Sequence, residues 1–495
     1  MRKYFTRLEN NHYLLPGQEG HGYEGWLGTD YQPLDIVTSD LQLGSLVTGA
    51  TVALSNETNI IVNLETLVAG DANSPSAKRD STPAIFQIPL STTDGKRGGS
   101  REFVVAVRDA KTDNGTKAYP LGKFPLRSFG FRGTSKLTWW TDVRTNCHVT
   151  KVTFNKSTPP RATGVEFLDG AYLYKASPKS SGEAGVAGSA TASREVIISG
   201  GTYNSPQLLK LSGVGPADEL KEFDIPVVVD LPGVGTNLQD HYEINVQGKA
   251  PTDFTAFNGC TFDGSAQDEC LKRWNKPVLG NRGIYASPGV GAAMFHKSSV
   301  AEKDNFDLFV FGGPINFRGY FPNYSVNATA DHDWFTWAIL KAHPRNTAGT
   351  VKLRSADPLD TPEITYNYFD TGSGDYEKDL TALNEAVHLA RESFKSQPIE
   401  ITEVLPGKDV TTKEAISEYA KDTAWGHHAS STCPIGADDD KMAVLDSSFR
   451  VRGTAGLRVV DASVYPKIPG TFTAVSTYMV AEKAADVILE QNSKE

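Results

Sequence analysis

Two adjacent histidines, His427 and His428, have the residue type in this chain best suited to moving a proton. They precede a turn of small residues in the stretch 425–436. An imidazole titrates near neutral pH, so either ring could take a proton from an alcohol as a general base. Either could also bind a metal ion, or be a structural histidine bonded to the backbone. Adjacent side chains are expected to project in different directions, and no third and fourth ligand follows at metal-site spacing, so we predict no metal site here.

The stretch 201–215 is a second pattern with chemical meaning, because a glycine pair separates a short strand from a helix. Residues 194–200 have a short strand pattern, Ser205-Pro206 is typical of a helix start, and Gly213 of a helix end. Paired glycines let another group approach the main chain, and a helix N-terminus suits an anion such as a pyrophosphate. An ordinary strand-to-helix turn would show the same glycines.

The full stretch 201–215 resembles the second signature of the glucose-methanol-choline (GMC) flavoprotein oxidoreductases, with a small residue pair, Ser-Pro, two aliphatic residues and Ser-Gly-aliphatic-Gly. Residues 231–241 resemble the next block of that family, and residues 343–358 resemble a strand of its substrate domain. The resemblance implies an FAD-dependent oxidoreductase that acts on the CH–OH group of a small alcohol, an aldehyde hydrate or a related substrate. It also implies a histidine base and hydride transfer to flavin N5.

The resemblance assigns roles to particular residues. GMC enzymes place their catalytic histidine four residues before the threonine of a His-x-x-x-Thr-Cys block, and that position is His428 here. We expect His427 to point the other way and to support the substrate pocket. For FAD, the family pattern implies a main-chain contact to the adenine at Val149, contacts to the pyrophosphate at Gly200, Asp461 and Ala462, and contacts to the isoalloxazine at Thr473 and Ala474.

The position before the last helix departs from the family pattern. Most GMC enzymes have a His or Asn there, which binds the substrate oxygen together with the catalytic histidine. Counting back along the helix places Phe472 at this position of the substrate pocket, and counting forward from His428 places Thr471 there. Neither residue is a His or Asn, so we expect a one-histidine active site or a second group from elsewhere. Residues 469–472 look most similar to fungal-type members such as formate oxidases and small-alcohol oxidases.

A larger departure is that no Gly-x-Gly-x-x-Gly follows a strand and opens a helix. We therefore expect the first βαβ unit of the flavin fold to lie outside this chain, as in a truncated fungal-type member. The alternatives are a catalytically inactive or cofactor-free paralogue, and a lyase on the same fold.

Both strands and helices are needed to position the candidate site residues. A hairpin is predicted from 148–154 and 162–167, a large antiparallel sheet from aromatic-rich segments such as 307–311 and 334–340, and helices over 380–394 and 474–490. We expect an α/β (mixed α+β) fold in which an incomplete FAD-binding Rossmann-like domain is interleaved with an antiparallel-sheet substrate domain. The expected parts are a loop-rich covering region at 1–130, the FAD-binding domain at 131–241, the substrate-binding domain at 242–424, and a C-terminal FAD-binding segment with the catalytic histidine at 425–495.

Composition limits the partners and leaves the location open. The net charge of −10 argues against nucleic acid and anionic membranes, which bind basic faces. No stretch approaches the roughly 18 apolar residues of a membrane span, and the first residues lack the apolar core of a signal peptide. A small-molecule substrate is therefore the expected partner. Cys260 and Cys270 could form a disulfide, but two free thiols are favoured over a bond.

Overall fold

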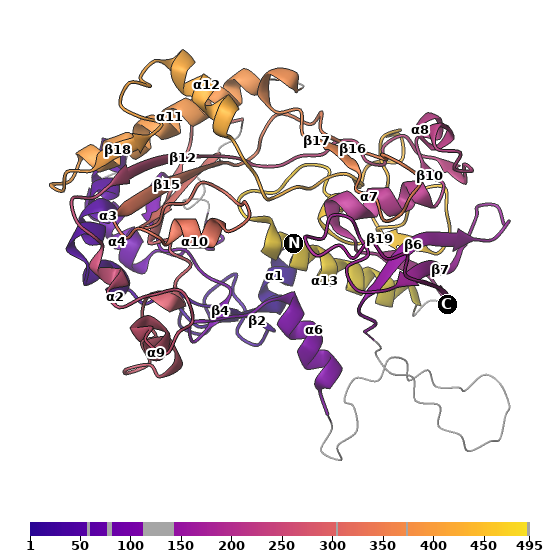
Figure 1. Cartoon of the computed structure of the whole chain (residues 1–495), viewed down its shortest axis with the longest axis horizontal. Coiled ribbons are helices and arrows are strands. Elements are labelled where there is room, and N and C mark those ends of the chain that lie inside the picture. The colour runs from indigo at the N-terminus through magenta and orange to yellow at the C-terminus, as the bar shows by residue number, and fades with distance from the viewer. Residues whose placement is uncertain (57–59, 77–81, 112–142, 303–304, 373–374, 493–495) are drawn as a thin grey trace.

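The computed structural model describes residues 1–56, 60–76, 82–111, 143–302, 305–372 and 375–492 (Figure 1). Two lobes can be followed along the long axis of the view. One is built on a large sheet with helices α3, α4, α11 and α12, and the other gathers α7, α8, α13 and several small sheets. Among the described residues, no helix is both long and apolar enough to cross a bilayer.

The large sheet has six strands in the order β18-β12-β15-β14-β13-β3, and every neighbouring pair is antiparallel. This result confirms the antiparallel sheet predicted from the aromatic-rich segments. The strands are β3 (Ala84–Phe86), β12 (Tyr242–Lys249), β13 (Ala292–His296), β14 (Leu308–Gly313), β15 (Trp334–Lys341) and β18 (Thr402–Leu405).

Alternating side chains give this sheet two different faces, as the period of two in a strand requires. On one face, Met294, Val310 and Ile339 belong to the main core together with residues of α3 (Leu41–Ala53) and α11 (Tyr376–Lys395). The opposite face, called here the site face, carries an aromatic cluster that includes Phe295, Phe309 and Phe311. The remaining helices of this lobe are α2 (Asp35–Thr38), α4 (Ile60–Ala69), α9 (Glu269–Asn275), α10 (Tyr324–Ala328) and α12 (Lys413–Thr423).

The second lobe contains the predicted hairpin and a parallel strand pair. β6 (Cys147–Phe154) pairs antiparallel with β7 (Ala162–Asp169), which confirms the hairpin, and β8 (Val186–Thr191) adds a third strand. β9 (Val196–Ile198) runs parallel to β19 (Leu457–Val459), and no third strand joins this sheet within the described residues. The helices are α7 (Gly201–Leu211), α8 (Ala217–Glu222) and α13 (Thr473–Asn492), and the short strands are β10 (Val214–Gly215), β11 (Val229–Asp230), β16 (Thr350–Lys352) and β17 (Glu363–Thr365).

The N-terminal region is more regular than the loop-rich covering that its glycines and prolines suggested. β3 forms an edge of the six-stranded sheet, and α3 packs on α11. The misleading signal is the composition of α3, whose glycine and small residues lie in buried positions against that neighbour. The other elements are α1 (Arg2–Leu8), which packs on α13, α6 (Ser100–Asp109), β1 (Glu9–Asn11), β2 (Leu27–Thr29), β4 (Thr92–Thr93) and β5 (Lys96–Arg97). Residues 112–142, at the expected boundary near residue 130, lie outside the described part.

Helix α7 begins at Gly201, four residues before the predicted start at Ser205. Pro206 therefore stands inside the helix and cannot donate to the carbonyl of Thr202 four residues earlier. Thr432 Oγ1 donates to that carbonyl oxygen instead, at 2.6 Å. A hydrogen bond from a distant segment thus allows the helix to extend past the sequence signal for its start.

Cys260 and Cys270 form a disulfide, which corrects the expectation of two free thiols. The bond closes a loop with a sequence separation of 10 residues. Both cysteines are buried at the edge of the main core, so their packing favours pairing in a way that their sequence spacing did not indicate.

Candidate active site

Backbone pairing brings the histidine pair to the start of β12. Glu243 N donates to Trp425 O at 2.8 Å, and Trp425 N donates to Glu243 O at 3.0 Å. Further along, Gln239 N donates to Ser430 O at 3.2 Å, and Ser430 N donates to Gln239 O at 2.9 Å. These two antiparallel bridges hold 425–430 against 239–243, so the histidine pair faces the first residues of β12.

Asp240 fixes the main chain of the histidine pair. Its Oδ1 accepts hydrogen bonds from His428 N at 2.7 Å and from His241 N at 2.9 Å. A Cβ added at Gly426 would stand 2.4 Å from Asp240 Oδ2 and 2.7 Å from His241 O, so only glycine fits there without a shift. Burial raises the pKa of Asp240 to about 7.

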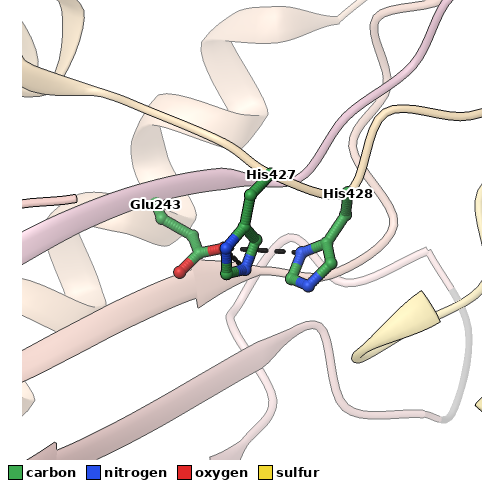
Figure 2. A group of neighbouring side chains, drawn as sticks. All are labelled: Glu243, His427 and His428. Atoms are coloured by element: carbon green, nitrogen blue, oxygen red, sulfur yellow. Dashed lines mark ion pairs between the residues drawn. The ribbon is translucent and has the colours of Figure 1, made fainter. Parts of the chain in front are cut away.

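The ring of His428 is held from one side. Its side chain is 9% exposed, and Nδ1 lies 3.2 Å from His241 Nδ1 and 3.4 Å from Glu243 Oε1. The second nitrogen, Nε2, points away from Glu243 and His427 (Figure 2). A neutral imidazole can accept a proton at Nε2 only when Nδ1 carries the ring hydrogen, and His241 Nδ1 lies within hydrogen-bond distance on the Nδ1 side. The arrangement therefore suits Nε2 as the basic atom.

His427 lies beside His428, which corrects the expectation that it points the other way. The two ring centroids are 3.9 Å apart, and His427 Nε2 stands 3.1 Å from Glu243 Oε1 (Figure 2). The stretch around them is irregular, so neighbouring side chains need not alternate as they would in a strand. Tyr320 covers the ring of His427 at 4.7 Å, and the His427 side chain is 27% exposed.

Glu243 is the residue of this group that sequence reasoning missed. Its side chain is fully buried, and neither carboxylate oxygen has a hydrogen-bond partner among the described residues. His241 and His428 are 187 positions apart in the sequence, so the contact between their segments could not be predicted from local spacing. Only strand pairing brings the two segments together. One signal was present in the sequence, because the polar residues Glu243, Asn245 and Gln247 alternate with apolar residues directly after the block 231–241.

Burial dominates the electrostatics of this group. Burial, with a smaller contribution from the neighbouring His427, lowers the pKa of His428 to about 3. Burial also lowers the pKa of His241 well below its ordinary value and raises the pKa of Glu243. Each shift favours the uncharged form, so the His428 imidazole is neutral near neutral pH and is a weaker base than a free imidazole.

Phe472 reaches the site from the start of α13. Its ring lies 5.5 Å from that of His428 and meets Phe309 and Phe311 edge-on at 5.2 and 5.6 Å. The structure thus brings Phe472 to the candidate base, and Thr471 adjoins it in the chain. A phenyl ring neither donates nor accepts the hydrogen bond that a His or Asn would make to a substrate oxygen.

The segment after the histidines is tied to the second lobe. Ser431 N donates to Ala462 O at 3.1 Å, and Cys433 N donates to Ser463 O at 2.8 Å. Ser431 has a φ of +77°, which is uncommon for a residue other than glycine. Thr202 Oγ1 donates to Ala429 O at 2.7 Å, so α7 also holds this segment. The histidine pair therefore stands where both lobes meet.

The residues expected to bind FAD fit that cofactor in part. Val149 and Ala462 are half-buried, Gly200 is exposed, and Thr473 and Ala474 begin α13. Two main-chain groups are already used within the chain, because Gly200 N donates to Ser205 Oγ and Ala462 O accepts from Ser431 N. The family pattern assigns main-chain contacts to Asp461, and these stay a prediction. Its side chain has a structural role, because Oδ2 accepts from Gly201 N and Ser205 Oγ while Oδ1 accepts from Ser463 N and Oγ.

The same carboxylate occupies the N-terminus of α7. A phosphate placed there would meet the charge of Asp461, so the expectation that this helix end receives the pyrophosphate is not supported. The helix end is already satisfied by an anion from within the chain.

Comparisons with known proteins define the class and then the family. The fold matches that of a formate oxidase from Aspergillus oryzae, with a TM-score of 0.73 and 21% sequence identity over 100% of this chain and 78% of that chain. It is a mixed α/β oxidoreductase fold. Two models of GMC oxidoreductases match residues 139–243 and 344–481. The chain belongs to the GMC oxidoreductase family, as the sequence motifs indicated.

The curated relatives are bacterial. An oxygen-dependent choline dehydrogenase of Pseudomonas savastanoi pv. phaseolicola is 36% identical over 310 residues, which are 60% of this chain and 50% of the relative. That of Pseudomonas fluorescens is 33% identical over 380 residues, which are 74% of this chain and 60% of the relative. The chain thus spans between half and three-fifths of the length of these two relatives.

Proposed function

We propose that this protein is an FAD-dependent oxidoreductase that acts on the CH–OH group of a small substrate, with His428 as the general base. The observation that carries the proposal is the ring of His428, which is buried, neutral and held on its Nδ1 side, so that Nε2 is left to take the hydroxyl proton. Asp240 holds the backbone of the same residue, which keeps the ring from turning away.

FAD binding by this chain is part of the proposal. When bound, FAD would supply the hydride acceptor, which no side chain can replace. The start of α13 would hold the ring system at Thr473 and Ala474, and main-chain groups at Val149, Gly200 and Ala462 that are not already bonded would contact the remainder. Asp461 keeps a structural role at the N-terminus of α7.

The site face favours a substrate that is positively charged or rich in hydrogen-bond donors. Along β12, Glu243, Asn245 and Gln247 each have a buried acceptor oxygen without a partner among the described residues. Three aromatic rings gather beside them, with Phe317, Tyr320 and Trp425 between 5.3 and 5.8 Å from one another. Aromatic faces and a buried carboxylate together bind ammonium groups. Choline, the substrate in the name of the curated relatives, has this chemistry.

A matched pair of alcohols tests the proposal. Choline and its neutral carbon isostere 3,3-dimethylbutan-1-ol have the same shape and differ in charge. In anaerobic rapid mixing, choline should reduce the flavin with a kred/Kd at least tenfold higher than the isostere, and Glu243→Gln should remove most of that preference. Equal reduction by both alcohols, unchanged in Glu243→Gln, would refute the cationic substrate. A purified protein that shows no flavin absorbance and cannot be loaded with FAD would refute the flavoenzyme and support a cofactor-free paralogue.

A lyase on the same fold predicts a different outcome. In that case a flavin-loaded protein would convert its substrate without bleaching of the flavin absorbance, because the histidine would do acid–base work alone. Substrate-dependent bleaching under anaerobic conditions would exclude this alternative.

A further inference from the structure

Three possible metal donors from two distant segments meet at one point. His427 Nε2, His428 Nδ1 and a carboxylate oxygen of Glu243 lie within 4.8 Å of one another. Two of these separations are short, with 3.1 Å from Glu243 Oε1 to His427 Nε2 and 3.4 Å from the same oxygen to His428 Nδ1. Figure 2 shows both rings turned toward the carboxylate. Donors around a tetrahedral zinc ion stand about 3.4 Å apart, which follows from bond lengths near 2.0–2.1 Å.

Glu243 gives an independent indication of a ligand. A fully buried carboxylate without a hydrogen bond to either oxygen is costly, and such groups in folded proteins are paired or bound to a cation. The nearest nitrogen, His427 Nε2, is close enough but is not aligned for a hydrogen bond. The carboxylate is therefore aimed into the group without a partner that satisfies it.

We propose that Glu243, His427 and His428 form a binding site for a divalent transition-metal ion of the zinc class. Two imidazoles and one carboxylate are a donor set that such ions prefer, whereas Mg²⁺ and Ca²⁺ prefer oxygen donors alone. His241 Nδ1 lies 3.2 Å from His428 Nδ1 but is not a member of this group of three donors. The partly exposed ring of His427 gives the ion a way in. Neighbours along the sequence supply only the two histidines, and strand pairing adds Glu243 as the third ligand.

The metal would change what His428 can do. An ion on Nδ1 uses the lone pair of that nitrogen, so the hydrogen of the neutral ring must move to Nε2. A ring with Nε2–H cannot accept a proton there. Zinc would thus inhibit the oxidation, and this consequence, unlike the binding itself, rests on the proposed function.

Metal binding is tested on the purified full chain, after chelator treatment and without substrate. Equilibrium dialysis against Zn²⁺ followed by elemental analysis should give one ion per chain, and Mg²⁺ at the same concentration should give none. Zn²⁺ should also raise the thermal midpoint, since it binds the folded state. Absence of stoichiometric Zn²⁺ would overturn the proposal, whether or not the protein carries flavin.

Variants locate the ion. Glu243→Gln and His427→Gln should each weaken Zn²⁺ binding by at least the roughly 10- to 100-fold that loss of a supporting partner costs a metal site. His388→Gln, at an exposed position of α11, is the matched control and should bind as the parent protein does. Circular dichroism melts in the absence of metal show whether Glu243→Gln still folds, and His427→Gln tests the site at a more exposed position. Parent-like affinity in both folded variants, or a loss in His388→Gln, would place the ion elsewhere and overturn the assignment.

A final comparison separates the consequence from the binding. In flavin-loaded protein, Zn²⁺ should suppress flavin reduction and a chelator should restore it, with less inhibition in His427→Gln. One bound ion per chain with undiminished reduction would keep the metal site and refute the role of His428 Nδ1 as a ligand.

Discussion

His428 is held by its main chain to Asp240 and by its ring to His241, so its position does not depend on a bound substrate. A pre-positioned base of this kind lowers the barrier for proton removal. We predict that His428→Ala lowers the rate of flavin reduction by roughly 10² to 10⁴, measured by anaerobic rapid mixing. His427→Ala should cost much less, because its nitrogen faces Glu243 and not the Phe472 side. Equal losses in the two variants would contradict the assignment of the base.

Burial of His428 predicts an unusual titration. Its pKa is lowered to about 3 from the ordinary 6.5, so between these pH values the unfolded chain binds a proton that the folded chain does not. This residue therefore lowers the stability as the pH falls through that window, and its effect ends above the ordinary pKa. The NMR signal of the His428 ring, assigned by its loss in His428→Asn, should show no titration near neutral pH. A midpoint at or above the ordinary value would contradict the burial argument.

At the residue scale, the sequence points to His428 as the candidate base, which stays a prediction, and it does not indicate the residues that contact His428. The four-residue spacing from His428 to Thr432 is a local pattern and could be read directly. Glu243 acts at a distance in sequence, and only the bridge between Glu243 and Trp425 brings it close. The direction of His427 could not be derived either, because it depends on an irregular backbone held by Asp240 and not on a regular strand.

At the scale of elements, α7 depends on a hydrogen bond from outside the helix. Thr432 Oγ1 satisfies the carbonyl of Thr202 that Pro206 leaves without a donor. We predict that Thr432→Val, which keeps the shape and removes the hydroxyl, lowers the free energy of unfolding by about 1–3 kcal/mol in a denaturant titration. The control is Thr423→Val on α12, where an exposed residue bonds to its own helix, and its effect should stay within about 0.5 kcal/mol. Equal effects of the two substitutions would mean that the α7 bond contributes little.

The same helix shows why element boundaries were harder to predict than elements. The hairpin of β6 and β7 and the long helices α11 and α13 follow from local periodicity, and all were predicted. The start of α7 was wrong because Ser-Pro is a strong local signal for a helix start. Asp461 overrides that signal, since its carboxylate accepts from Gly201 N and fixes the first turn from 260 residues away.

At the scale of the whole molecule, the disulfide adds stability to the sheet lobe. Linking Cys260 to Cys270 restricts the unfolded chain over a loop of 10 residues, which the chain-entropy model values at roughly 2–3 kcal/mol. We predict that the double variant Cys260→Ser/Cys270→Ser loses about this much unfolding free energy. Thiol titration of the unfolded, unreduced parent should find two free cysteines, Cys147 and Cys433. Four free thiols would show that the bond does not form in the purified protein.

The large antiparallel sheet was predicted from the sequence, but the strand that the N-terminal part adds to it was not. The antiparallel sheet followed from alternating aromatic residues, whereas β3 has three residues and pairs with β13 more than 200 positions later. A strand of three residues is too short to show a detectable alternation of apolar and polar residues, so its place in the sheet is decided by tertiary pairing alone. The two-stranded parallel sheet of β9 and β19 likewise depends on segments at distant positions.

The stretch from Trp425 to Cys433 is bonded first to residues 239–243 and then to residues 462–463, with the change of partner between Ser430 and Ser431. Its amide hydrogens can meet solvent deuterium only when one lobe opens or when the two separate. Hydrogen–deuterium exchange should therefore be slow at the amides of Trp425, Ser430, Ser431 and Cys433. The exchange rates of all four amides should rise together under conditions that weaken the contact between the lobes. These amides would report the coupling between the lobes beside His428, and the measurement requires no catalytic turnover.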